Sequence, residues 1–229
     1  MPQTVSLFNK VAKHYDSLNT FFSLGMDTLW RKKLALELNG ASSILDVATG
    51  TGEVAIQMVK NLSGVKVTGL DPSAGMLELA QNKINVPGIS KNISLIQGSA
   101  ENLPFSDESF DAVSIAFGIR NTQDPIKSLS EMRRVLRPGG RAGIMEFAIP
   151  ENRLFKPLYL FYFKNILPLV ASVFGNKNEY KYLSDSTSAF PQRERFIELM
   201  EKSGLRVDKK VELMLGIVII YVGVNDTES

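Results

Sequence analysis

The stretch Ile44-Leu45-Asp46-Val47-Ala48-Thr49-Gly50-Thr51-Gly52 decides the fold of this chain. Its first four residues have the β-rich, mostly apolar character of a short buried strand. Glycines follow at positions 50 and 52, where that strand must turn into a helix predicted over 53–61. Glycine has no Cβ, so the backbone can adopt positive φ and a ligand can lie against it. The stretch therefore predicts a strand-turn-helix unit that binds a nucleoside.

On either side of this unit, short β-rich runs alternate with helical patterns, which is typical of βαβ units and a parallel sheet. The predicted strands are 44–47, 66–70, 93–96, 112–116 and 142–147, and the predicted helices are 53–61, 73–83 and 125–136. A further helix over 192–202, with Gly204 as its stop, precedes strands at 207–213 and 217–222. Met214-Leu215-Gly216 separates these last two strands as a hairpin. We predict an α/β fold with a doubly wound, mostly parallel, seven-stranded sheet and an antiparallel C-terminal hairpin.

Two segments fall outside this alternation. We expect one domain over 1–229, with a helical N-terminal cover at 1–40 and a helical insertion at 149–190. Such additions commonly cover the carboxyl edge of the sheet, where ligands bind. Arg137-Pro138-Gly139-Gly140 is predicted to form a turn before the strand at 142.

Composition narrows the class of protein. Twenty-six basic and 24 acidic residues give a net charge of +2, which does not by itself indicate a nucleic-acid partner. The absence of cysteine excludes disulfides, thiolate catalysis and cysteine-ligated zinc, and we predict no metal site. The N-terminus lacks the pattern of a signal peptide, and lysines and prolines interrupt the apolar stretch 154–174. We expect a cytoplasmic protein.

The chemistry of the turn favours one ligand class. The turn lacks the third glycine of a dinucleotide fingerprint, which disfavours an NAD-dependent reductase. Asp46 before the turn favours a cationic ligand such as S-adenosylmethionine. Asp71 closes the second strand, where an acid can accept hydrogen bonds from both ribose hydroxyls. It can also cap the helix predicted at 73–83, and the two roles can coexist.

Several longer motifs resemble the ubiquinone/menaquinone biosynthesis C-methyltransferases, a family of class I methyltransferases. The resemblance covers almost the whole chain, and its most specific parts are Phe117-Gly118-Ile119-Arg120-Asn121 and Tyr180-Lys181-Tyr182-Leu183. The other matching motifs are 8–19, 24–27 with Trp30-Arg31, 101–105, 131–140, and Ser186 with Phe190-Pro191. The resemblance implies a class I, Rossmann-like fold.

The resemblance also implies the cofactor, S-adenosylmethionine, and its contacts. It assigns them to Thr51, Asp71, Ser99 with Ala100, and Ala116, which add to the residues Asp46, Gly50 and Gly52 of the turn. Two positions depart from the family pattern. Position 99 is often Asp or Asn, and position 116 is often Ser, so these contacts are expected to be weaker, water-mediated or made by the backbone.

The implied reaction is methylation of a ring carbon on a polyprenylated quinol such as demethylmenaquinol, with a ubiquinone-pathway benzoquinol as the alternative ring. Arg120 and Asn121 are the favoured catalytic pair, with Arg120 stabilising a developing phenolate. The alternative for Arg120 is a structural ion pair with Glu146 or Asp124. His14, the only histidine, and Tyr180 are further candidates, and Tyr182 either donates to the second ring oxygen or packs.

The aromatic-rich segment 154–174 has two interpretations. It can lie at the inner membrane surface with Lys156 and Lys164 at the headgroups, leaving room for the prenyl tail. It can equally form a core helix or a homodimer face. Three other functions stay open: methylation of a sterol, phenol or amine, nucleotide-dependent reduction, and non-catalytic nucleoside binding.

Overall fold

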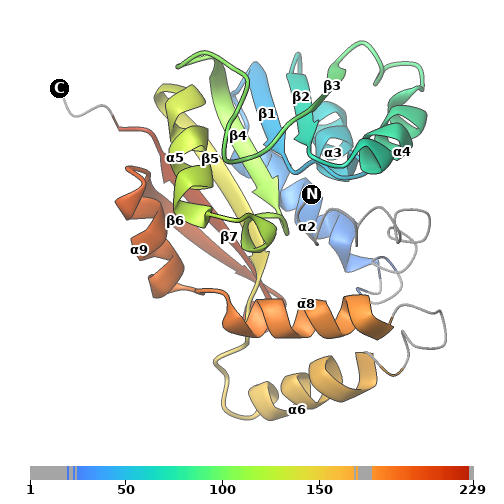
Figure 1. The fold of residues 1–229 in the computed structure, drawn as a ribbon, viewed down its shortest axis with the longest axis vertical. Coiled ribbons are helices and arrows are strands. Elements are labelled where there is room, and N and C mark those ends of the chain that lie inside the picture. The colour runs from blue at the N-terminus through green and yellow to red at the C-terminus, as the bar shows by residue number, and fades with distance from the viewer. Residues whose placement is uncertain (1–19, 21–22, 24, 168, 170–176, 227–229) are drawn as a thin grey trace.

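A seven-stranded sheet forms the centre of the molecule (Figure 1). The computed structural model describes Thr20, Ser23, residues 25–167, residue 169 and residues 177–226, with the backbone only for 177–180. The strands are β1 Ser43–Val47, β2 Lys66–Asp71, β3 Ile93–Gln97, β4 Phe110–Ala116, β5 Leu136–Phe147, β6 Arg206–Leu213 and β7 Val218–Val224. Their order is β3-β2-β1-β4-β5-β7-β6, and β7 runs antiparallel to both of its neighbours. The predicted doubly wound sheet with an antiparallel hairpin is confirmed.

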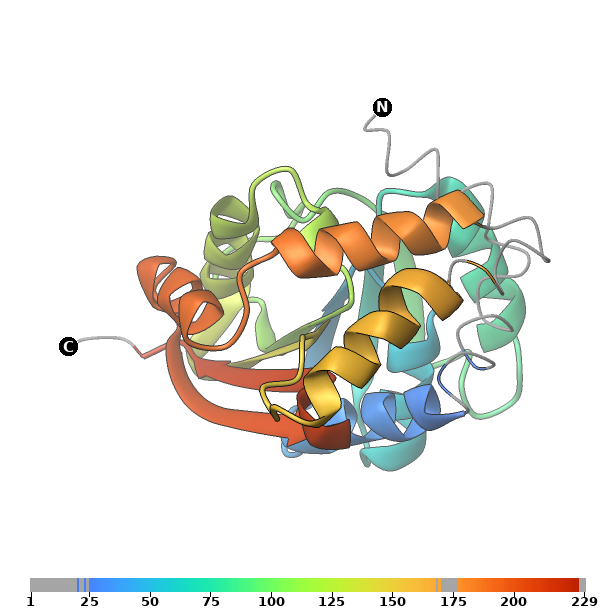
Figure 2. The same ribbon diagram turned by 90° about the horizontal axis from the view of Figure 1, so that it is seen from below.

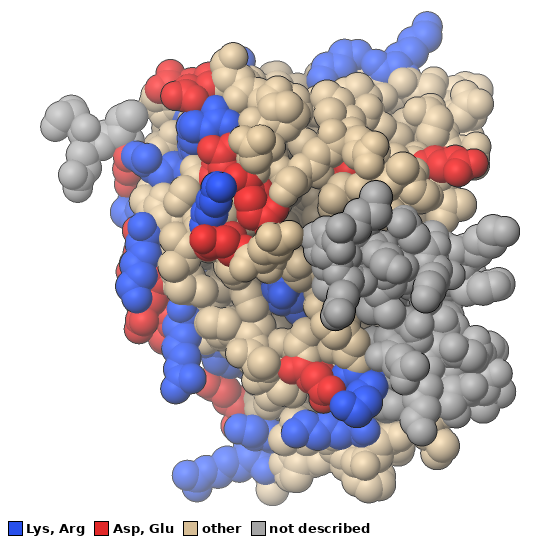
Figure 3. All heavy atoms as spheres, viewed as in Figure 1, with Lys and Arg blue, Asp and Glu red and all other residues tan. Residues whose placement is uncertain are grey.

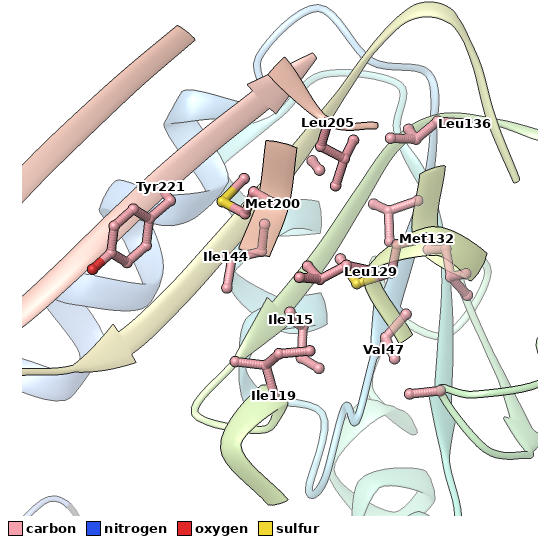
Figure 4. Close-up of a cluster of buried hydrophobic side chains, with 14 of the residues drawn as sticks. Val47, Ile115, Ile119, Leu129, Met132, Leu136, Ile144, Met200, Leu205 and Tyr221 are labelled. Atoms are coloured by element: carbon pink, nitrogen blue, oxygen red, sulfur yellow. The ribbon is translucent and has the colours of Figure 1, made fainter. Parts of the chain in front are cut away.

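Helices cover both faces of the sheet. Helices α2 Met26–Glu37, α3 Glu53–Asn61 and α4 Ala74–Ile84 pack on one face, where they bury one apolar cluster. Helices α5 Pro125–Val135 and α9 Glu194–Lys202 cover the other face and bury a second cluster. Figure 4 shows Leu129 and Met132 of α5 and Met200 of α9 pointing at the strands in this second cluster.

Helices α4 and α5 each begin directly after a residue whose side chain caps the helix. The hydroxyl of Ser73 accepts a hydrogen bond from the Met76 amide at 3.1 Å, and Asp124 accepts one from the Lys127 amide at 3.0 Å. Each cap satisfies an amide that the first helical turn leaves unpaired. The helix cap considered for Asp71 is therefore wrong, because Ser73 supplies that cap. After the C-terminal end of α9, Gly204 has a φ of 84°, as expected of the glycine that stops a helix.

The predicted turn at 137–140 is wrong. Strand β5 already begins at Leu136, which pairs with Phe110, and the next pair joins Arg141 to Ala112. The four residues between them form a bulge of the strand. Asn225 secures this bulge, because its side chain donates to the Leu136 carbonyl and its own carbonyl accepts from the Gly139 amide, both at 2.8 Å. A partner 86 or more residues away thus overrides the local preference of Pro-Gly-Gly for a turn.

The predicted insertion crosses the carboxyl ends of the parallel strands. Helix α6 Phe155–Phe161 continues into a π-helical turn, Tyr162–Ile166, and helix α8 Lys177–Ala189 lies beside it (Figures 1 and 2). Tyr159, Phe163 and Leu167 form its own small buried cluster. No helix in the described part of the chain has the length and hydropathy needed to cross a bilayer.

Candidate functional site

The glycine-containing turn after β1 is built from left-handed backbone. Ala48, Gly50 and Gly52 have φ of 52°, 56° and 81°, and the Thr49 amide donates to the Leu70 carbonyl at 3.0 Å. A Cβ on Gly52 would lie 3.3 Å from the Ala80 Cβ, so glycine there lets α3 pack closely on α4. A Cβ on Gly50 would meet no described atom within 4 Å. The turn therefore has open space above Gly50, as a ligand lying on the backbone requires.

Asp71 joins the end of β2 to this turn. One carboxylate oxygen accepts from the Gly50 amide and the other from the Ser73 amide, each at 2.8 Å. Burial raises the pKa of Asp71, and these two amides oppose that shift. Each carboxylate oxygen can accept a second hydrogen bond, so the pair of oxygens retains capacity for two ribose hydroxyls. That role for Asp71 stays a prediction.

Asp46 lies beneath the turn and is almost completely buried. Its two oxygens accept hydrogen bonds from the hydroxyls of Thr49 and Ser114, each at 2.6 Å. Burial raises the pKa of Asp46 to about 6, although the two hydroxyls lower it. The carboxylate thus holds β1 against β4 and fixes the first residue of the turn. Its predicted contact with a cationic ligand stays a prediction.

Two charged residues of α5, for which the sequence predicted no role in the site, hold the loop after β3. Arg134 donates to the carbonyls of Leu103 and Phe105 at 3.1 and 2.8 Å, while Glu131 accepts from the Leu103 amide at 2.8 Å. Arg134 and Glu131 also pair with each other at 2.7 Å. These two residues of α5 therefore fix the loop that was predicted to contact adenine. No spacing in the sequence indicates contacts between 103–105 and 131–134.

Within that loop, the predicted contact residues have defined neighbours. The Ser99 hydroxyl donates to Glu101, whose other oxygen accepts from the Gln123 amide at 2.7 Å. Ala100 is buried with its methyl group in the core, so a contact between Ala100 and adenine would use its backbone. Glu101 thus joins the loop after β3 to the segment after β4.

The most characteristic motif lies directly beside the turn. A Cβ on Gly118 would lie 2.8 Å from the Ala48 Cβ, so only glycine lets the end of β4 approach the end of β1 this closely. Phe117 has a φ of 56°, and Ala116 is the last residue of β4. The motif and the glycine turn are 65 residues apart in sequence, counted from Gly52 to Phe117, and they form one site at the carboxyl edge.

Arg120 forms a buried ion pair with Glu146, one of the two partners considered from the sequence. Both side chains are about 5% exposed, and the guanidinium also donates to the Phe117 carbonyl at 2.8 Å and lies over the Phe147 ring. Burial raises the pKa of Glu146, and the charge of Arg120 opposes that shift. Among the described residues, neither Arg120 Nε nor Glu146 Oε2 has a hydrogen-bond partner. Backbone contacts thus hold the ion pair in place, and Arg120 Nε and Glu146 Oε2 can each still bind a further hydrogen-bond partner.

Asn121 is tied to the covering helix. Its amide nitrogen donates to the Phe117 carbonyl at 3.2 Å, and its oxygen accepts from the Tyr182 hydroxyl at 3.0 Å. Tyr182 is therefore the tyrosine of α8 that the structure brings to the site. His14 lies outside the described residues, and so does the side chain of Tyr180.

Aromatic rings line the site on one side. The rings of Phe117 and Phe147 stack with centroids 4.3 Å apart, and Trp30 of α2 meets both rings edge-on at 6.4 and 6.3 Å. No periodic pattern in the sequence predicts this cluster, because its members come from three separate elements.

The site fits the cofactor that the motifs predict. Three features meet where the strand order reverses, between β1 and β4. They are the open space above Gly50, the unused acceptor capacity of Asp71 at the end of β2, and the fixed loop after β3. Open α/β sheets bind nucleosides at this position. Asp71 would hold the ribose of S-adenosylmethionine, and residues 99–100 would contact the adenine.

Comparisons with known proteins agree with this site. The model of the ubiE/COQ5 methyltransferase family matches residues 3–225. The chain is 42% identical over 222 residues to the ubiquinone/menaquinone biosynthesis C-methyltransferase UbiE of Geotalea daltonii, with 95% of this chain and 94% of the relative covered. It is 42% identical over 224 residues to the demethylmenaquinone methyltransferase of Chlorobaculum tepidum, covering 95% and 90%. A SAM-dependent methyltransferase from Aquifex aeolicus has the same fold, with a TM-score of 0.59, 21% identity and 85% and 88% coverage.

The buried acid beneath the turn predicts a pH dependence of stability. Because the pKa of Asp46 is raised from 3.8 to about 6, protonation favours the folded state, and this contribution is lost as pH rises from about 4 to about 6. Relative to the unmodified protein, Asp46→Asn should therefore gain roughly 2–3 kcal/mol between pH 4 and pH 7 in urea unfolding. Asp111→Asn is the control, because the pKa of Asp111 is lowered from 3.8, so its contribution changes only below about pH 4 and this variant should parallel the unmodified protein between pH 4 and pH 7. Parallel profiles for Asp46→Asn and the unmodified protein would contradict the prediction.

Proposed function

This chain belongs to the ubiE/COQ5 methyltransferase family and is an S-adenosylmethionine-dependent methyltransferase of quinone biosynthesis, and we propose that its acceptor is demethylmenaquinol. The naming of the Chlorobaculum relative as a demethylmenaquinone methyltransferase supports the naphthoquinol ring. The relatives named for both ubiquinone and menaquinone support a benzoquinol as the second candidate.

The reduced ring is the reactive form. Bound S-adenosylmethionine supplies an electrophilic methyl group, so the protein's task is to align and desolvate a carbon nucleophile. A quinol carbon becomes nucleophilic when a neighbouring hydroxyl loses or shares its proton. The ring carbon then gives up its hydrogen as a proton after the new carbon–carbon bond forms. The chain must therefore stabilise negative charge on a ring oxygen.

Arg120 is suited to that task. Its guanidinium lies at the carboxyl ends of β4 and β5, and the carbonyl of Phe117 and the carboxylate of Glu146 hold its orientation. A fixed cation in a buried site stabilises a developing phenolate without reorganisation. Asn121 and Tyr182 position α8 over this point. The proton acceptor stays open, and His14 and Tyr180 remain candidates for it.

Peripheral membrane contact through 154–174, at the inner membrane surface, also belongs to this proposal. A quinol with a prenyl tail resides in the bilayer, and helix α6 of this segment adjoins the carboxyl edge that carries the site. A homodimer through the same segment is the competing use of it. Binding to lipid vesicles, together with light scattering, separates membrane contact from dimer formation.

Replacing both members of the buried pair tests the role of Arg120. Arg120→Gln combined with Glu146→Gln removes both charges, so no uncompensated ion is buried and the fold should be retained. We expect kcat to fall by about 10²–10³-fold, as for loss of one preorganised donor, with unchanged affinity for S-adenosylmethionine. Arg137→Gln, which breaks an exposed pair with Asp111 at the opposite edge, is the control. A double variant with normal kcat would show that the pair is structural.

Asp71→Ala tests the ribose contact. Loss of one or two charge-assisted hydrogen bonds should weaken S-adenosylmethionine binding by about 2–4 kcal/mol, measured by calorimetry. Asp226→Ala, which removes an exposed partner of Arg206 far from the site, should bind normally. Equal affinity of all three proteins would mean that Asp71 only braces the Gly50 turn.

The acceptor is tested by extracting quinones from cells that lack this protein. Accumulation of demethylmenaquinone, reversed by the intact chain but not by the Arg120 and Glu146 double variant, is the expected result. Accumulation of a benzoquinone precursor would select the second candidate. Unchanged quinones would contradict a role in quinone biosynthesis.

A further inference from the structure

The tip of the β6–β7 hairpin carries apolar side chains that the methyl-transfer site does not use. Met214 and Leu215 are 45% and 68% exposed. Both have left-handed backbone, with φ of 49° and 57°. Glycine and asparagine adopt this conformation far more readily than long apolar residues do. The chain thus keeps two large apolar side chains in solvent at a position where they also strain the backbone.

The tip lies at the carboxyl edge of the sheet, beside helix α6. Strand β7 begins at Val218, which pairs with Phe147 at the end of β5, so the loop before it shares the edge that carries Arg120 and Glu146. Ile217 packs against the buried cluster of the insertion, and its carbonyl accepts from the Ala148 amide at 2.8 Å. The tip and α6 are therefore neighbours across one edge.

A buried arginine fixes the tip relative to the insertion. Arg193 donates to the carbonyls of Gly216 and Ile149, each at 3.3 Å, and pairs with Glu212. Gly216 has a φ of 85°, and a Cβ there would lie 2.6 Å from the guanidinium. The hairpin and the first residue of the insertion thus share one anchor. The exposed tip is a rigid projection from the sheet.

Helix α6 has a second apolar face that points away from the protein. Tyr159 and Phe163 face inward, whereas Leu154, Leu158 and Phe161, spaced by four and three residues on one face, are 89%, 65% and 58% exposed. Residues 152–169 and 213–217 contain no acid, and Arg153, Lys156 and Lys164 are basic. Glu151 and Glu212 precede these ranges, and both pair with Arg193. Figure 3 shows mostly uncharged atoms at the lower end of the molecule, where α6 lies, with both basic and acidic side chains at the border.

We propose that Met214 and Leu215 are a second membrane-insertion point, which works together with the outer face of α6 to seat the carboxyl edge on an anionic bilayer. This inference rests on the proposed peripheral contact of 154–174 and adds the hairpin tip to it. Two apolar points set apart on one edge would fix the tilt of the protein, and the three basic residues Arg153, Lys156 and Lys164 suit anionic headgroups. A quinol would then enter the site from the acyl layer without passing through water.

The test is flotation with vesicles of phosphatidylcholine and phosphatidylglycerol in equal parts. Met214→Asn with Leu215→Asn removes both side chains and supplies a residue that tolerates the left-handed backbone, so the fold should persist. We expect vesicle binding to weaken by roughly tenfold or more, since apolar burial is lost. Activity on a short-tailed quinol in detergent should be unchanged. Val86→Asn, at an exposed position after α4 on the opposite edge, should bind normally.

A second variant separates this inference from the proposal beneath it. Leu158→Gln with Phe161→Gln alters only the outer face of α6. If this variant loses vesicle binding while the tip variant keeps it, the tip inference is overturned and the contact of 154–174 stands. If the unmodified protein does not float, both membrane statements fail, whereas quinone extraction still decides the reaction. If light scattering finds a dimer that the tip variant dissociates, the surface is an interface between copies and the inference is overturned.

Discussion

The structure depends on the close approach of three strand ends at the reversal of strand order. The end of β4 reaches the end of β1 because Gly118 leaves room for Ala48, and the end of β2 is tied to the same turn by Asp71. A side chain at position 118 would push these ends apart by more than the packed core tolerates. The cofactor site and the motif around Arg120 exist as one site only because of this approach.

Asp46, Asp71 and Glu146 are buried near that edge, and a different kind of partner stabilises each carboxylate. Asp46 is held by two hydroxyls, Asp71 by two backbone amides and Glu146 by a guanidinium. A buried acid without such partners would be costly. The different partners give the acids different uses, because hydroxyls and amides fix backbone, whereas the guanidinium beside Glu146 brings a positive charge to the position proposed for a developing phenolate.

The covering elements connect this edge to the surroundings of the protein. Tyr182 of α8 reaches Asn121, and Arg193 secures both the start of the insertion and the base of the hairpin tip. Helix α6 therefore packs inward through one apolar face and presents another outward. A protein that takes a lipid-soluble acceptor needs both faces, one to enclose the reaction and one to meet the source of the acceptor.

The order of elements, the turn at Gly50 and Gly52, and the family could all be predicted from the sequence, because strand and helix periodicities and short motifs are local properties. It also predicted Glu146 as a partner for Arg120, as one of two carboxylates considered. It mispredicted the segment 137–140, whose bulge depends on Asn225. It could not predict that Tyr182 meets Asn121, that Arg134 and Glu131 hold the loop after β3, or that the hairpin tip adjoins α6. These contacts join residues from separate elements, and their pairing is set by sheet order and packing, which no local pattern encodes.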